Sequence, residues 1–517
     1  MNQINILWVD DEIDSLKSQI IFLENKGYHV SALTNGYDAL EFLRDNIVDV
    51  VLLDESMPGI TGLETLGKIK EINQQIPVVM ITKNEAENVM DEAIGSQITD
   101  YLIKPVNPNQ VLLSLKKIID NKRLVAEKTT TAYQQQFRTL FMALNDNPNH
   151  EEWADIYKKL VYWEMEMAKS DSPEMLEVLQ SQKSEANTEF AKFIARNYAD
   201  WVAPGAKNAP IMSHTLFSKK VLPLLDPSVP NFFILIDNLR YDQWKAIQPI
   251  FSESFRVVEE DTFYSILPTS TQYARNAIFS GMLPIDIEAK FPDEWKNDDE
   301  EGGKNLHEEK FIAAQLARLK MDPKFSYTKV VHHADGQHLV NNMHNLLNYP
   351  LNVIVYNFVD MLSHARTEME VLKELAGDEV SYRSITTSWF EHSPLHQALK
   401  KISDKKINLI IATDHGSVRV KTPVKVIGDK QTTTNLRYKH GRNLNYDPKE
   451  VLAFRDPKDA GLPRPNVNSS YIFARGDGYL CYPNNYNFFV NYYRNTFQHG
   501  GISLEEMIVP VAKMVSK

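Results

Sequence analysis

Three apolar runs in the second half of the chain lead directly into residues that bind metal ions. Phe-Ile-Leu-Ile precedes Asp237, Val-Ile-Val-Tyr-Asn-Phe-Val precedes Asp360 with His364, and Leu-Ile-Ile-Ala-Thr precedes Asp414 with His415. Apolar runs that end in acids predict buried parallel strands with ligands gathered at one rim of the sheet. Carboxylates and histidines in three such positions indicate a hydrolase that uses two metal ions.

The spacing of these residues supports shared ligation. Asp360 and His364 lie four positions apart, so a helix that starts just after the strand would turn both towards one ion. Asp414 and His415 are adjacent and offer two contacts to a second ion. A further histidine, His499, precedes two glycines, which allow a close backbone approach.

A second group of polar residues lies in the first hundred or so positions. Short apolar runs alternate there with helical patterns, which predicts an α/β domain with a parallel sheet. The runs end in Asp10-Asp11, Asp54, Thr82 and Lys104. Clustered carboxylates favour Mg²⁺, which would also bind an incoming phosphoryl group, and Lys104 could pair with that group.

Length and composition limit the class of protein. At 517 residues the chain is long enough for roughly three domains. The net charge of -12 argues against a surface that coats polyanions, and a single cysteine, Cys481, excludes a zinc site built on several thiolates. The sequence shows no signal peptide and no apolar run near membrane-spanning length, so we expect a cytoplasmic location.

The segment from about 123 to 205 has apolar residues at helical spacing and predicts three helices. Asn145–Asn149 ends the first, and Ser172 with Pro173 opens the third. Its aromatic residues are expected to form a core between the helices rather than a ligand site. The sequence contains no evident helix-turn-helix or basic recognition helix, so a DNA-binding output is not expected.

Residues 1–122 resemble the receiver domain of bacterial response regulators over their whole length. The resemblance rests on Asp10-Asp11, Asp54, Met57-Pro58-Gly59, Thr82 and Lys104-Pro105. It implies that Asp54 accepts the phosphoryl group and that Asp10, Asp11 and Asp54 hold Mg²⁺. It also implies a switch made by Thr82, Tyr101 and Lys104.

Residues 206–517 resemble the alkaline phosphatase superfamily and, within it, the PglZ-type domain, which has an α/β/α fold. The resemblance implies two Zn²⁺ ions. One would be held by Asp360, His364 and His499, and the other by Asp237, Asp414, His415 and the Thr271 hydroxyl.

Thr271 lies in Leu-Pro-Thr-Ser-Thr-Gln-Tyr-Ala-Arg, which resembles the family's nucleophile segment, and Thr269 and Ser270 are its competitors. The expected route is in-line attack by Thr271 on phosphorus, a phosphothreonine intermediate and hydrolysis by water. Arg275, one turn later, could hold non-bridging oxygens or could be an ordinary surface residue. The segment contains neither Cys nor the Pro of a sulfatase motif, so sulfate esters are disfavoured.

Two polar segments complete the candidates. Arg437, Tyr438, Lys439 and Arg442 form a basic, aromatic patch in an acidic chain, which could bind phosphates and stack a base or could be a solvated loop. The acidic stretch Asp293–Glu301 is expected to be a solvated insertion.

The order of receiver, helical linker (123–205) and PglZ-type domain resembles the PorX-type response regulators linked to type IX secretion. That resemblance implies a sensor histidine kinase, a homodimer promoted by phosphorylation, and a phosphodiesterase acting on oligonucleotides or cyclic nucleotides. Two alternatives are a scaffold whose output is contact with a sigma factor or secretion component, and a phosphomonoesterase.

Overall fold

The computed structural model describes residues 4–83, 98–169, 173–298, 300–321, 323–357, 377–429 and 432–517. The chain divides into two compact units, Met1–Ala132 and Tyr133–Lys517. Asp360 and His364 lie outside the described residues, so the predicted first zinc site is described only at His499. None of the helices in the described part of the chain combines the length and apolar character that crossing a bilayer requires.

The first unit contains a five-stranded parallel sheet in the order β2-β1-β3-β4-β5. The strands are β1 (Ile4–Val9), β2 (Tyr28–Leu33), β3 (Val50–Asp54), β4 (Val78–Thr82) and β5 (Asp100–Ile103). The described helices before β5 are a 3₁₀ turn (Ile13–Leu16), α1 (Lys17–Glu24), α2 (Gly36–Asp45) and α3 (Gly62–Ile72). Alternate residues of β1 enter two separate cores, one on each face of the sheet. The predicted α/β domain with a parallel sheet is confirmed, and helices on both faces make it doubly wound.

Three long helices follow, as the apolar spacing predicts. They are α5 (Pro108–Asn145), α6 (His150–Lys169) and α7 (Pro173–Val202). Helix α5 is continuous through residue 122, so no loop separates the receiver's last helix from the linker's first. Trp153, Tyr157 and Phe190 are buried, and Trp153 packs edge-on against Phe190 at 5.3 Å between ring centroids. The aromatic residues therefore form a helix core, as expected.

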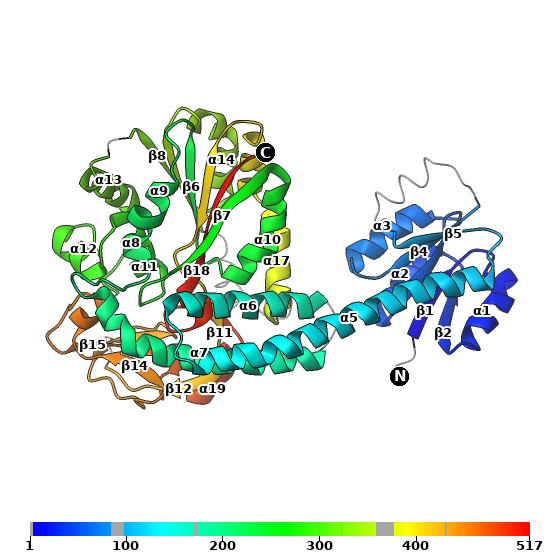
Figure 1. The fold of residues 1–517 in the computed structure, drawn as a ribbon, viewed down its shortest axis with the longest axis horizontal. Helices are drawn as coiled ribbons and strands as arrows, with labels where there is room; N and C mark the ends of the chain where they lie inside the picture. Colours follow the sequence, from blue (N-terminus) through cyan, green and yellow to red (C-terminus); the bar gives the residue numbers. More distant parts are fainter. Residues whose placement is uncertain are drawn as a thin grey trace. The chain divides into compact units, whose positions relative to one another are not determined.

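The second unit is built on a six-stranded sheet in the order β7-β18-β10-β6-β9-β8 (Figure 1). The strands are β6 (Asn231–Ile236), β7 (Phe255–Tyr264), β8 (Phe325–Val330), β9 (Leu351–Tyr356), β10 (Asn408–Ala412) and β18 (Ile508–Ser516). β10, β6, β9 and β8 are parallel, whereas β18 runs antiparallel to β10 and β7. The predicted parallel sheet is therefore the centre of a mixed sheet.

Helices cover this sheet on both sides. Figure 1 draws α10 and α17 on one side and α8, α11 and α13 on the other. The helices are α8 (Ser213–Leu216), a π-turn (Phe217–Val221), α9 (Leu222–Leu224), α10 (Tyr241–Ser254), α11 (Thr271–Ser280), α12 (Pro284–Lys290), α13 (Glu308–Arg318), α14 (His333–Leu346), α17 (Glu379–His392) and α18 (Pro394–Lys401). This layering confirms the expected α/β/α domain.

Smaller sheets lie beyond β10. β11 (Val418–Arg419) pairs with β17 (Phe497–Gln498), and β12 (Thr422–Lys425) pairs with β16 (Gly478–Cys481). β13 (Tyr438–Arg442), β15 (Ser469–Ala474) and β14 (Val451–Phe454) form a third sheet. A 3₁₀ turn (Pro457–Ala460), α19 (Tyr486–Tyr493) and α20 (Leu504–Met507) complete the chain.

Candidate functional site

The carboxyl ends of β6 and β10 bring three metal-binding side chains together. Asp237 follows β6, and Asp414 and His415 follow β10, its parallel neighbour. One ligand atom from each lies within 4.8 Å of the others, and all three residues are buried. Buried carboxylates require neutralisation, so this cluster can hold a divalent cation.

The orientation of His415 suits a metal ligand. Its Nδ1 lies 3.1 Å from the carbonyl oxygen of Gly416, so Nδ1 carries the proton that this contact requires. The lone pair of Nε2 then faces the carboxylates, 3.8 Å from Asp237 Oδ1 and 4.0 Å from Asp414 Oδ1. Such a backbone contact is the usual means of fixing the tautomer of a zinc-binding histidine, so the donor set fits Zn²⁺.

Thr271 is the first residue of α11 and its hydroxyl faces this cluster. Its Oγ1 lies 3.3 Å from Asp237 Oδ1 and 3.1 Å from His415 Nε2. Thr269, by contrast, donates to Gly501 O at 2.9 Å and accepts from Gly500 N at 3.1 Å in a fully buried position. Thr269 therefore has a structural role.

Arg275 lies one turn along α11 and is fully buried. Its guanidinium pairs with Asp237 and also with Asp414, whose Oδ2 is 2.9 Å from Nε. Burial alone would raise the pKa of Asp414, but the Arg275 guanidinium lowers it below its ordinary value. Arg275 is therefore not an ordinary surface residue, and here it holds the two carboxylates in place; its contact with substrate oxygens stays a prediction.

Two contacts at Arg275 were not predicted. Its Nη1 donates to Asn357 Oδ1 at 3.0 Å and lies 3.5 Å from Glu308 Oε1. Asn357 directly follows β9, so its place at a strand end is a signal that could have found it. Glu308 looks like an ordinary acid in the first turn of α13, and the sequence carries no sign of its burial.

His499 lies beside this cluster. Its ring stacks on that of His415 at 4.4 Å between centroids, and its Nδ1 is 3.3 Å from Thr269 O. The close approach at the following glycines is real, since Gly500 has φ 120° and Gly501 abuts the Arg437 guanidinium. His499 thus lies next to the cluster of Asp237, Asp414 and His415.

The receiver unit has its own acidic pocket. Asp10, Asp11 and Asp54 each offer an oxygen within 4.8 Å of the others, which fits the oxygen ligation of Mg²⁺. Lys104 Nζ lies 2.8 Å from Asp10 Oδ2 and 2.9 Å from Asp54 Oδ2. Burial raises the pKa of Asp54 although Lys104 opposes the rise.

The two other switch residues lie on β4 and β5. The Thr82 hydroxyl donates to Glu55, and Tyr101 is 43% exposed. Thr82 is the last residue of β4 and Lys104 directly follows the neighbouring strand β5, while the Tyr101 side chain lies partly at the surface.

The predicted nucleotide-binding patch is not a loop. Tyr438, Lys439 and Arg442 belong to strand β13, and Arg437, just before it, is fully buried in an ion pair with Glu506 at 2.6 Å. The Tyr438 hydroxyl donates to Asp298 at 3.2 Å. These contacts correct the expectation of a phosphate-binding loop.

The hydrogen bond between Tyr438 and Asp298 also contradicts the expectation that Asp293–Glu301 is a solvated insertion. Asp298 accepts hydrogen bonds from Tyr273 of α11 and from Tyr438, and Trp295 is buried. Part of the stretch Asp293–Glu301 is thus packed against α11.

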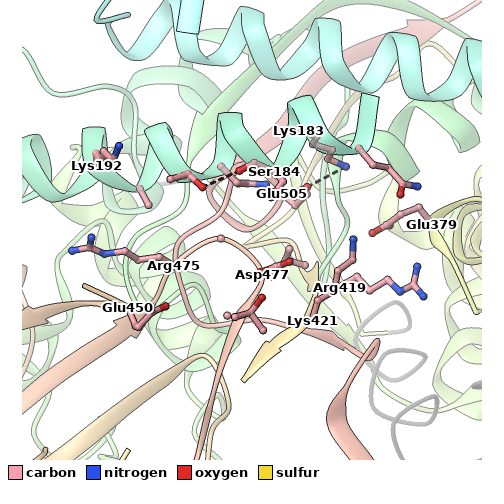
Figure 2. A pocket seen from close by; sticks show the side chains of 18 of the residues that line it. Lys183, Ser184, Lys192, Glu379, Arg419, Lys421, Glu450, Arg475, Asp477 and Glu505 are labelled. Carbon is pink, nitrogen blue, oxygen red and sulfur yellow. Dashed lines mark hydrogen bonds and ion pairs between the residues drawn. The ribbon is translucent and has the colours of Figure 1, made fainter. Parts of the chain in front are cut away.

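A cavity of about 300 Å³ lies between α7 and the loops beside β11 and β15 (Figure 2). Lys183, Arg419 and Arg475 line it together with Glu450 and Glu505. Both acidic and basic side chains line this cavity, which is therefore a polar seam between the helical linker and the phosphatase-like domain.

A buried ion network continues from this seam. Glu164 of α6 accepts from Lys183 of α7 at 2.8 Å and from Arg383 of α17, which also donates to Asp242 of α10 at 3.0 Å. Burial would raise the pKa of Glu164, but Lys183 and Arg383 lower it to about 2. Asp242 in turn pairs with Arg240, three residues after Asp237, so the network joins the linker to the strand that carries a metal ligand.

Comparison with known families matches three successive parts of the chain. A response regulator receiver domain matches residues 6–116, a PorX response regulator linker domain matches 123–202, and the BREX system PglZ alkaline phosphatase-like domain matches 216–514. Together these domains define a two-component response regulator with a phosphatase-like output domain. The chain belongs to the PglZ alkaline phosphatase-like family, which covers more than half of it, and its domain order is that of a PorX-type response regulator.

Several individual relatives each match about a quarter of the chain. The transcriptional regulatory protein ZraR of Klebsiella oxytoca is 36% identical over 26% of this chain and 30% of its own length, and ZraR of Escherichia coli K12 is 32% identical over 26% and 31%. The chain thus spans about 30% of the length of these curated relatives. A CheY-like receiver domain protein from Methanospirillum hungatei is 26% identical over 23% of this chain and 96% of its own, with a TM-score of 0.23. The receiver domain implies a histidine kinase partner, and the PglZ domain suggests hydrolase activity.

Proposed function

We propose that this response regulator is phosphorylated on Asp54 by a sensor histidine kinase and that its output domain is a zinc-dependent phosphodiesterase. The observation that carries the second part is the placement of the Thr271 hydroxyl, 3.3 Å from Asp237 Oδ1 and 3.1 Å from His415 Nε2. Oligonucleotides or cyclic nucleotides are the proposed substrates, and regulation of type IX secretion is the proposed role.

Each residue of the site has its own proposed role. Asp237, Asp414 and His415 would hold one Zn²⁺ with the Thr271 hydroxyl, and His499 would serve the second with Asp360 and His364. Bound zinc would lower the pKa of that hydroxyl and stabilise the charge that develops on the leaving oxygen. Thr271 opens α11, so the positive end of the helix dipole favours an anionic phosphoryl group beside it.

The role of Arg275 favours diesters over monoesters. A monoester carries a second phosphate charge, which usually requires an additional cationic group. The Arg275 guanidinium is already paired with Asp237, Asp414 and Glu308. In this arrangement the guanidinium is held by these acids rather than left free for the second charge of a monoester.

We expect zinc-loaded protein to hydrolyse bis(p-nitrophenyl) phosphate at least about tenfold faster than p-nitrophenyl phosphate, measured as kcat/KM from nitrophenolate release. Removal of the metal with a chelator should abolish the activity, and added Zn²⁺ should restore it.

A faster reaction with the monoester would support the phosphomonoesterase alternative. Absence of both reactions in protein with a full zinc content would favour the scaffold alternative.

A separate prediction concerns phosphorylation of the receiver domain. Incubation with acetyl phosphate and Mg²⁺ should add one phosphoryl group to the wild-type protein, as seen in the intact mass. Asp54→Ala should accept none, because the carboxylate that receives the group is gone. Asp45→Ala, which removes an exposed acid of α2, is the matched control and should be labelled normally.

We also propose that phosphorylation promotes a homodimer through the receiver. Light scattering with and without a beryllofluoride phosphoryl mimic should show a doubled mass, and an unchanged mass would contradict the proposal. Asp54→Ala should remain unchanged in the same measurement.

A further inference from the structure

Lys439, the second residue of β13, is a buried cation outside the metal site. It is 1% exposed, and its Nζ lies 4.4 Å above the centroid of the Tyr482 ring. No carboxylate within the described ranges forms an ion pair with it. Burial of an ammonium group without a counter-charge is costly, and here it lowers the pKa of Lys439 to about 7.

A cavity of about 500 Å³ adjoins this lysine. Most of its wall is apolar or aromatic and comes from β13, β16, α19 and the segments beside them. Its principal lining residues are Leu436, Lys439, Leu480, Tyr482, Phe489 and Tyr493. The volume is in the usual range for small-molecule sites, which combine apolar walls with a few polar groups that orient the ligand.

We propose that this cavity, the Lys439 pocket, binds an organic monoanion, a carboxylate with an aromatic or aliphatic body. The carboxylate would accept a hydrogen bond from Lys439 Nζ and supply the missing counter-charge. The body would lie against Leu480, Phe489 and Tyr493.

The charges of the pocket favour a single negative charge. Lys439 is the cationic residue among the described lining residues, and Asp429 adds an acid. A phosphate dianion is usually held by several cationic donors or by a bidentate arginine, and the lining offers neither. A carboxylate therefore fits the site better than a phosphate.

The pocket is separate from the metal site, but strand β13, which contributes Lys439 to the pocket, also contacts α11. Successive side chains of a strand point to opposite faces, so Tyr438 and Lys439 face opposite ways. Tyr438 packs against Tyr273 of α11 at 6.0 Å between ring centroids, two residues after Thr271. The inference does not depend on the proposed diesterase activity.

The test is a fluorescence titration of the full-length protein with 2-naphthoate, a probe of this class. The wild-type protein should bind it saturably at one site. Lys439→Met keeps the length of the side chain but removes the charge, and it should weaken binding by about tenfold or more. Lys425→Met, at an exposed position of β12, is the matched control and should bind like the wild type.

The neutral analogue 2-naphthamide measures the contribution of the apolar walls to binding without that of the charge. It should bind the wild type and Lys439→Met equally. Lys439→Met should also unfold at the same temperature as the wild type or higher, because the variant no longer buries an unpaired amine.

The affinity for 2-naphthoate should fall between pH 6 and pH 9. Only protonated Lys439 attracts the carboxylate, and the proton is lost as pH rises through the pKa of about 7. The other titratable lining groups are Asp429, Cys481, Tyr482 and Tyr493, and burial raises the pKa of Cys481 to about 11 and that of Tyr482 to about 12. No saturable binding, equal binding by Lys439→Met, or an affinity that rises with pH would overturn the proposal.

Discussion

Replacing Thr271 with alanine should lower the rate of diester hydrolysis by about a thousandfold or more, because a missing nucleophile removes the covalent step itself. The hydroxyl is the one at the start of α11 that faces both Asp237 and His415. The measurement is kcat for bis(p-nitrophenyl) phosphate at matched zinc content, so that a loss of metal is not mistaken for a loss of chemistry.

Two neighbouring variants sharpen this result. Thr271→Ser keeps a hydroxyl at the same position and should retain measurable activity, whereas Ser270→Ala should stay within about threefold of the wild type, since Ser270 precedes α11 and is buried. If Thr271→Ala kept more than a tenth of the wild-type rate while Ser270→Ala lost it, Ser270 would be the nucleophile.

The second large effect concerns stability. Arg275→Met should lower the free energy of unfolding of metal-free protein by roughly 3–5 kcal/mol, because it leaves Asp237 and Asp414 buried without their cation, whereas Glu308 keeps its ion pair with Lys329. The loss should be smaller in zinc-loaded protein, in which bound metal would neutralise the same two aspartates. Urea unfolding with and without zinc measures both values.

Arg437→Met is the matched control for this prediction. Arg437 is equally buried and pairs with Glu506, which is no candidate metal ligand, so its loss should be the same with and without zinc. An identical loss for Arg275→Met in both conditions would show that Arg275 does not share its carboxylates with a metal.

The sequence alone predicts which side chains cluster when those side chains directly follow buried parallel strands. Asp237, Asp414 and His415 follow β6 and β10, and parallel strands bring such positions to one edge without further information. Thr271 was different, because its position at the start of a helix distinguishes it from Thr269 only when the contacts of both hydroxyls are known. Resemblance to a family, rather than spacing, made it the expected nucleophile.

Polar side chains that are buried could not be recognised from the sequence. Arg437 and Lys439 look like residues of a solvated basic loop, yet Arg437 is neutralised by a glutamate 69 positions away and Lys439 lies beside an apolar cavity. Asp298 likewise lies in an acidic stretch but accepts from two buried tyrosines. Each of these roles depends on a partner distant in the chain.

The boundary between the receiver and the linker also could not be predicted from the sequence. Helical spacing predicts helices on both sides of residue 122, but it does not show whether one helix ends there. Helix α5 runs from Pro108 to Asn145 without interruption, so the end of the receiver is the middle of a helix.

The central claim is that the Thr271 oxygen attacks phosphorus. In that step the hydroxyl loses its proton, Oγ1 forms a bond to phosphorus, and one nitrophenolate leaves, so a nitrophenylphosphoryl group remains on Thr271 until water displaces it. Rapid quenching of zinc-loaded protein mixed with bis(p-nitrophenyl) phosphate, followed by mass spectrometry of the peptide that contains residues 269–271, tests this directly. We predict the adduct on Thr271 and its absence in Thr271→Ala. An adduct on Ser270 or Thr269, or nitrophenolate release by Thr271→Ala at the wild-type rate, would contradict the account.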